Sequence, residues 1–78
     1  MPTIDLIDDV KINIYNGDHR PPHIHACYEN HEVILEIESD NIYAGEIPDD
    51  KLKSVFDWLI GNTDWALEVF YTLNPELK

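Results

Sequence analysis

Three of the four histidines of this 78-residue chain fall within one short polar block. The block reads Asp18-His19-Arg20-Pro21-Pro22-His23-Ile24-His25. His23 and His25 are two positions apart, so on a β-strand both imidazoles project from one face and can approach one ion or one substrate. The two prolines fix φ and stiffen the approach to that strand, which suits a site whose groups must be held in place.

A metal site is one chemistry that this block could carry. His19, His23 and His25 with one carboxylate form a donor set that suits zinc or another divalent metal with an open coordination position. A carboxylate could also accept a hydrogen bond from an imidazole and so fix its tautomer. The candidate carboxylates are Asp18, Glu36 and Glu38.

Two other interpretations need no metal. In the first, a histidine of the pair His23 and His25 is held by Glu36 or Glu38 and acts as the general base of a hydrolase such as a nuclease, with Tyr15 as a nearby proton donor. In the second, which we favour, the histidines pair with glutamates on an acidic sheet face and lie at a partner interface. The residues expected to form the binding surface are Asp18, His19, Arg20, Pro21, Pro22, His23, His25, Glu36 and Glu38.

Alternation of apolar and polar residues predicts the strands that must position these groups. In the first strand Ile4 and Leu6 share one face, and Asp8-Asp9 suits a tight turn to the second. The predicted strands cover residues 3–7, 10–16, 23–28, 32–38 and 42–47.

The third and fourth strands form a predicted hairpin with its tip at residues 29–32. This loop predicts the apolar pairs Ile24–Ile37, Ala26–Leu35 and Tyr28–Val33. His25 then faces Glu36 and His23 faces Glu38 on the other side of the hairpin.

After Pro48 the apolar period becomes that of a helix. Asp49 or Asp50 is the expected N-terminal cap of this helix, and Gly61 is its expected end. Thr63 or Asp64 is expected to cap a second helix, which stops at Asn74-Pro75. We therefore expect an α+β fold: a small curved antiparallel sheet of four to five strands, followed by two C-terminal helices packed on one face.

The composition favours a folded, acidic protein. With 44% hydrophobic residues the chain is expected to form one domain over residues 1–78, too small for a Rossmann fold or a barrel. There are 16 acidic and 5 basic side chains, and residues 31–50 contain no Lys or Arg. Such a charge repels phosphates and disfavours nucleic-acid binding. A basic protein partner fits better, and a homodimer is a further expectation for so thin a core.

The cysteine count and the hydropathy pattern bear on location. Cys27 is the single cysteine, so no intramolecular disulfide can form, and no apolar run reaches the ~18 residues of a membrane span. We therefore expect a cytoplasmic protein without a membrane segment.

The chain also resembles a small bacterial family over essentially its whole length. The resemblance rests on the opening Met1-Pro2-Thr3-Ile4, the Asp18-His19-x-Pro21-Pro22-His23-x-His25 block, Gly45-Glu46-Ile47-Pro48 and Trp58-Leu59. The family is domain-of-unknown-function family 4160. It implies a short stand-alone protein, often encoded beside another small protein in a toxin–antitoxin-like pair, without an established activity.

Overall fold

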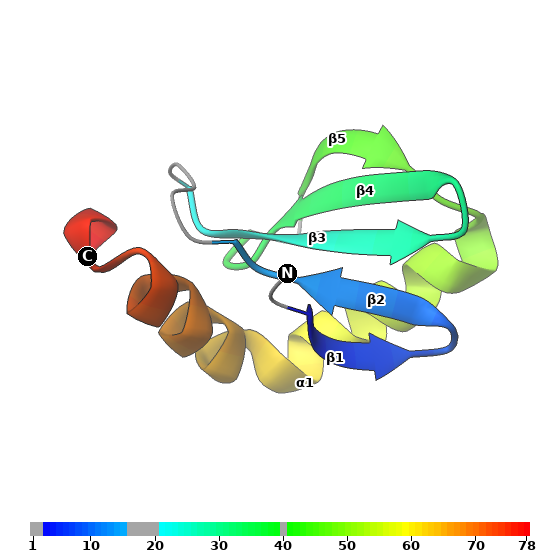
Figure 1. Ribbon diagram of the computed structural model, residues 1–78. Coiled ribbons are helices and arrows are strands. Elements are labelled where there is room, and N and C mark those ends of the chain that lie inside the picture. Colours follow the sequence, from blue (N-terminus) through cyan, green and yellow to red (C-terminus); the bar gives the residue numbers. More distant parts are fainter. Residues whose placement is uncertain (1–2, 16–20, 40) are drawn as a thin grey trace.

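The computed structural model describes residues 3–15, 21–39 and 41–78. Five strands form one sheet in the order β1-β2-β3-β4-β5, and every neighbouring pair is antiparallel (Figure 1). The prediction of an α+β fold with an antiparallel sheet of four to five strands is confirmed. The elements are β1 (Thr3–Ile7), β2 (Val10–Asn13), β3 (His23–Tyr28), β4 (His31–Glu36), β5 (Ile42–Glu46), helix α1 (Asp49–Leu73) and the 3-10 turn η1 (Pro75–Leu77).

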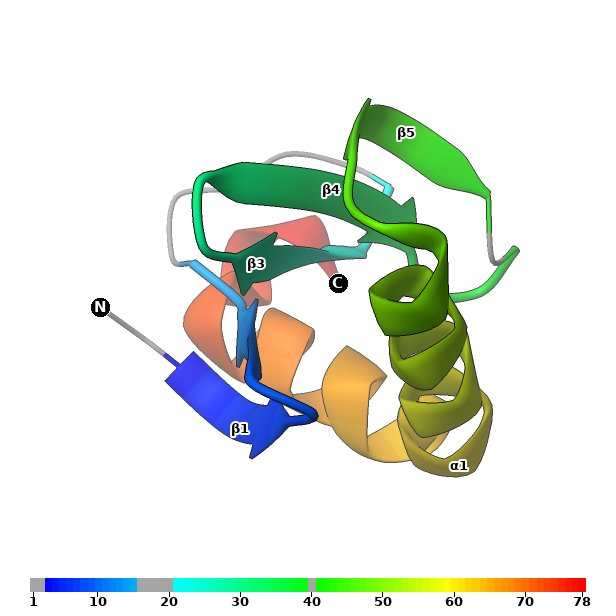
Figure 2. The same ribbon diagram turned by 90° about the vertical axis from the view of Figure 1, so that its right-hand side faces the viewer.

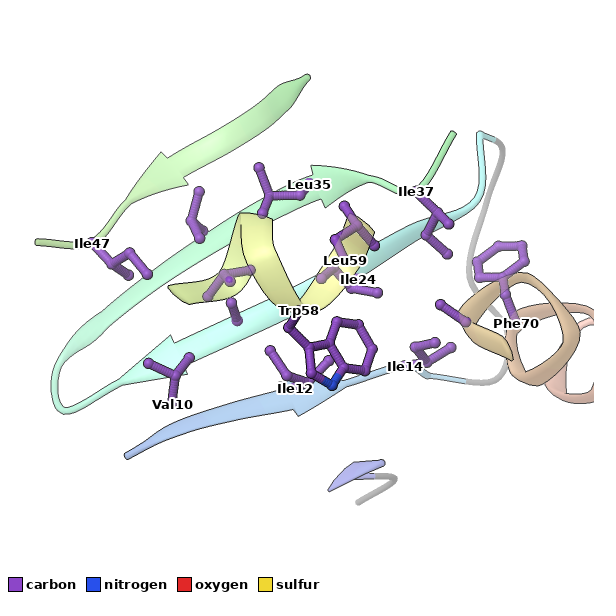
Figure 3. Close-up of a cluster of buried hydrophobic side chains, with 14 residues drawn as sticks. Val10, Ile12, Ile14, Ile24, Leu35, Ile37, Ile47, Trp58, Leu59 and Phe70 are labelled. Carbon is purple, nitrogen blue, oxygen red and sulfur yellow. The ribbon is translucent and has the colours of Figure 1, made fainter. Parts of the chain in front are cut away.

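One face of the sheet carries the buried apolar side chains. Helix α1 covers this face (Figures 1 and 2). Because side chains alternate along a strand, every second residue of β2, β3 and β4 points to the helix. We call this the helix face and the opposite side the outer face. The helix face and α1 together enclose the core in Figure 3, which includes Val10, Ile12, Ile14, Ile24, Leu35, Ile37, Leu59 and Phe70.

The predicted register of the β3–β4 hairpin is wrong by two residues. The connection is Glu29-Asn30 rather than residues 29–32, and Glu29 adopts a φ of 52° that allows so tight a turn. The apolar pairs become Ile24–Leu35 and Ala26–Val33. A shift of two residues returns every side chain to its original face, so the apolar pattern does not distinguish the two registers.

The prediction of two helices separated at Gly61 is also wrong. α1 continues through Gly61 and bends at Asn62, whose φ of -132° and ψ of 18° are not helical. The Asn62 amide donates to the Trp58 carbonyl at 2.8 Å, and the Thr63 hydroxyl donates to the Leu59 carbonyl at 2.8 Å. These side chains satisfy carbonyls at the bend, so helical structure resumes directly after the non-helical Asn62 while the chain changes direction (Figure 2).

The N-terminal cap of α1 differs from the prediction as well. Pro48 occupies the cap position and no side chain caps the helix. Asp49 and Asp50 instead lie in the first turn, where their charge favours the positive end of the helix dipole. The predicted end is correct, because α1 stops at Leu73 and Asn74 follows.

A hydrogen bond joins the first strand to the helix. The Trp58 indole donates to the Asp5 carboxylate at 2.7 Å. A bulge between Thr3 and Asp5 places Asp5 opposite Ile12, on the helix face. Leu6 is therefore turned outward and is 60% exposed, contrary to the expectation that it would share a face with Ile4.

Among the described residues, no helix is both long enough and apolar enough to cross a membrane.

The two glycines of the described C-terminal half should respond oppositely to alanine. Gly45 has a φ of 79°, and a Cβ there would overlap the Glu32 carbonyl oxygen, so Gly45→Ala should lower the free energy of unfolding by about 2 kcal/mol. Gly61 lies inside α1 with open space around it, so Gly61→Ala should raise it by about 0.5 kcal/mol. Urea denaturation measures both; equal effects would contradict the assigned backbone conformations.

The β1–β2 turn should make stability depend on pH. Hydrogen bonds from Lys51 and then Ser54 hold the pKa of Asp8 below its usual range. This stabilisation is present above about pH 4, the ordinary carboxyl pKa, and is lost as pH falls through the lower pKa of the folded state. Asp8→Asn keeps a side chain that tolerates the φ of 48° but removes the charge.

The difference in Tm between wild type and Asp8→Asn should therefore be largest near neutral pH and shrink at acid pH. Asp57→Asn is the matched control, because the Asp57–Lys53 pair lies within one exposed helix face. A difference for Asp8→Asn that stays constant from neutral to strongly acid pH would refute the role given to its charge.

Candidate functional site

The outer face of the sheet carries polar and aromatic side chains where the helix face is apolar. They come from the end of β2, from β3 and from the start of β4, and they touch one another in a continuous row. We call them the outer-face cluster. Its members are Asn13, Tyr15, His23, His25, Cys27 and Glu32.

His23 is held firmly at the start of β3. Its side chain is almost fully buried, at 2% exposure, and its Nδ1 lies 2.7 Å from the Pro21 carbonyl oxygen. A carbonyl only accepts, so Nδ1 carries the proton in this contact. The ring also lies 5.7 Å from that of Phe70, which comes from α1 at this end of the sheet (Figure 3). The burial of His23 among rings favours a positioning role over that of an exposed catalytic base.

Pro21 and Pro22 lie directly before β3, where the sequence predicted a stiff segment leading into the strand. Pro22 is buried, and its carbonyl accepts a hydrogen bond from the Ile37 amide at 3.0 Å, while Pro21 is exposed. Asp18, His19 and Arg20 fall outside the residues that the structure describes, so the metal set with His19 stays a prediction. Within residues 3–15, 21–39 and 41–78, no three His, Cys, Asp or Glu side chains are grouped as metal ligands.

His25 contacts a carboxylate, as predicted, but the carboxylate belongs to Glu32 rather than to Glu36. Its Nδ1 lies 3.2 Å from the Glu32 carboxylate, and its side chain is 14% exposed. His25 stands opposite Ile34 in the observed register, which makes Glu32 its diagonal neighbour. The Tyr15 ring lies perpendicular to the His25 imidazole at a centroid distance of 4.6 Å, so Tyr15 does lie beside the histidines.

The predicted pairings with Glu36 and Glu38 are wrong. The register places Glu36, not Glu38, opposite His23, and the Ser39 hydroxyl donates to the Glu36 carboxylate at 3.0 Å. Glu38 lies in the exposed turn after β4. Among the described residues, neither carboxylate forms a hydrogen bond or an ion pair with an imidazole.

Asn13 and Glu32 are members of the cluster that sequence reasoning missed. Asn13 is 1% exposed, accepts from the Thr3 hydroxyl at 2.8 Å and donates to the Tyr15 hydroxyl at 3.2 Å. Asparagine is uncommon in strand interiors, which is the one signal that could have drawn attention to Asn13. For Glu32, the signal was Asn30 at the tip, since asparagine favours two-residue turns.

Cys27 completes the cluster as a protonated thiol. Burial, and then the neighbouring Glu32 carboxylate, raise the pKa of the Cys27 thiol above its usual range. The Cys27 Sγ lies 3.6 Å from the Glu32 carboxylate, to which the thiol donates. This side chain also lines a hollow of about 300 Å³ together with Asp9, Lys11, Asn13 and Glu29. The thiol is accessible from that hollow but is a poor nucleophile at neutral pH.

Removing the Glu32 charge should increase the reactivity of Cys27. Glu32→Gln should lower the pKa of the thiol and speed its alkylation by iodoacetamide at about pH 8 roughly threefold, because the thiolate is the reacting form. Glu36→Gln is the matched control, since Glu36 lies on the same strand without contacting Cys27. Equal alkylation rates in wild type and Glu32→Gln would contradict the assigned contact.

A family model matches residues 10–70, which run from β2 through most of α1 and include the histidine–proline block. Neither the curated proteins nor the solved structures give a match. The match covers well over half of the chain, and the chain therefore belongs to the family described as a domain of unknown function, DUF4160.

Proposed function

We propose that the chain is a protein-interaction module that binds another small protein. The observation that carries this proposal is the exposure of β5, the last strand of the sheet. All five of its residues are exposed, and Ile42 and Tyr43 are 51% and 52% exposed. Large apolar side chains that stay exposed on an edge strand are typical of surfaces that a partner covers.

The charge around β5 supports a partner rather than a second layer of this chain. Glu36, Glu38, Glu46, Asp49 and Asp50 surround the strand in sequence, and none of them has a Lys or Arg partner among the described residues. Bringing a basic protein to this surface would relieve the repulsion between these carboxylates.

A toxin–antitoxin-like pair is the form of interaction that we propose. It is supported by the resemblance noted above, in which members of the family are often encoded beside another small protein. We also propose a cytoplasmic location, for which the single cysteine is the support.

A histidine-dependent hydrolase is the second candidate, and the contact between His25 and Glu32 favours it. A carboxylate that orients an imidazole is a common arrangement around a general base. Against it stand the burial of His23 and the protonated state of Cys27, which leave His25 as the base to test. In this alternative, His25→Ala would abolish a hydrolysis that the wild-type protein performs.

Co-expression with the product of the neighbouring small gene tests the interaction proposal. We expect the two proteins to co-purify and to elute as one species of combined mass in size-exclusion chromatography with light scattering. His25→Ala should leave that complex intact, because His25 is only 14% exposed and lies away from the β5 edge. Separate elution of the two wild-type proteins would refute the proposal.

A further inference from the structure

A bulge in β5 turns one aromatic side chain onto the outer face. Ile42 of β5 stands opposite Leu35 of β4, and Ala44 stands opposite Ile34. Since Ile34 and Leu35 are consecutive, Tyr43 is an extra residue of β5 without an opposite residue in β4. Bulges commonly re-aim a side chain in this way. The Tyr43 ring lies nearly parallel to that of His23, at 25° and a centroid distance of 6.2 Å.

Tyr43 thus has a supported ring that is still half open to solvent. Its exposure is 52%, whereas His23 beneath it is 2% exposed and is itself packed against Phe70. The ring is continuous with the folded core through these contacts, and β5 stands clear of α1 along this edge (Figure 2). A rigid, half-exposed aromatic face binds a partner with little loss of side-chain entropy.

In the described part of the sheet, the charged side chains on the same face as the Tyr43 ring in β4 and β5 are acidic, and this charge selects the partner. Glu36 stands opposite His23 in β4, and Glu46 stands three positions along β5 from Tyr43, facing Glu32. No Lys or Arg occurs in residues 31–50. A second copy would bring the same carboxylates to this surface, and a nucleic acid would bring phosphates, so both are repelled.

We propose that Tyr43, with Glu36 and Glu46 on the same face of the sheet, binds a basic segment of the partner protein in which an arginine stacks on the Tyr43 ring. This inference rests on the proposed function and names the chemistry of its partner. Arginine fits better than lysine, because the planar guanidinium can stack on a ring and donate to carboxylates at the same time.

A titration with defined peptides tests this chemistry on the intact protein. The probe is the blocked pentapeptide Val-Arg-Val-Arg-Val, followed through the backbone amide signals in ¹H–¹⁵N NMR at low salt. We expect shifts concentrated at Ile42–Glu46 and at Glu36. The same peptide with citrulline for arginine keeps the shape without the charge and should bind at least about threefold more weakly.

Variants of the protein assign the effect to this surface. Tyr43→Ala should weaken binding about three- to fivefold, and Tyr43→Phe should leave it nearly unchanged, because the ring rather than the hydroxyl is used. Glu46→Gln should also weaken it, whereas Glu68→Gln, an exposed acid on α1, is the matched control and should not. Equal binding of the arginine and citrulline peptides, or shifts located elsewhere, would overturn the inference.

The same variants in the co-expressed complex separate this inference from the proposed function. A complex that Tyr43→Ala and Glu46→Gln both leave intact would overturn the inference while the interaction module stands. Failure of the wild-type proteins to associate would refute the proposed function, and the peptide titration would then judge the surface on its own. A concentration-dependent dimer that Tyr43→Ala dissociates would assign the surface to a second copy and overturn the basic partner.

Discussion

The pairing of β3 with β4 determines which groups meet on the outer face. A two-residue turn at Glu29-Asn30 places Cys27 opposite Glu32 and His25 opposite Ile34. The Glu32 carboxylate then lies within reach of both the imidazole and the thiol. A turn longer by two residues would shift the pairing by two. The helix face would stay apolar, but other carboxylates would lie opposite the histidines, so the chemistry of the cluster depends on that turn.

The sheet has one face covered by the helix and one exposed edge, formed by β5. The covered face forms the core, and the exposed edge is available for binding. α1 packs on the helix face, and residues such as Ile12, Ala26 and Leu59 are fully buried there. β5 lies beyond the reach of this cover, which leaves Ile42 and Tyr43 exposed. Because a small domain has little apolar area to spare, two large exposed side chains on one strand favour a surface that binds.

The sequence predicted the strands well and the contacts between them less well. A period of two residues identifies a strand and its buried face, and β3 was predicted with its observed bounds. The same period cannot distinguish registers that differ by two, so Glu36 was paired with His25 where Glu32 is the partner. Gly61 was expected to end a helix, but side chains at the bend satisfy the backbone and α1 continues.

The candidate site shows the same limit. A histidine–carboxylate contact was predicted and is present at His25, but nothing in the alternation of β5 predicts a bulge at Tyr43. A bulge inserts one residue into one strand, and the alternation of apolar and polar residues continues on either side of it. The sequence pattern therefore does not reveal the position of the bulge. The acidic charge of residues 31–50, by contrast, is visible in the sequence alone and does not depend on register.

The rings around His23 connect the open surface with the core. Tyr43 stacks on His23 from the β5 side, and Phe70 of α1 packs against the same imidazole. The contact of His23 with the Pro21 carbonyl fixes the ring orientation that both neighbours use. His23 thus acts as a buried support rather than as an exposed catalytic group. It packs between Phe70 of α1 and Tyr43 of β5, so the position of the Tyr43 ring depends on the packing of the helix. A partner that covers Tyr43 would therefore meet a surface already ordered by the fold, which reduces the entropy lost on binding.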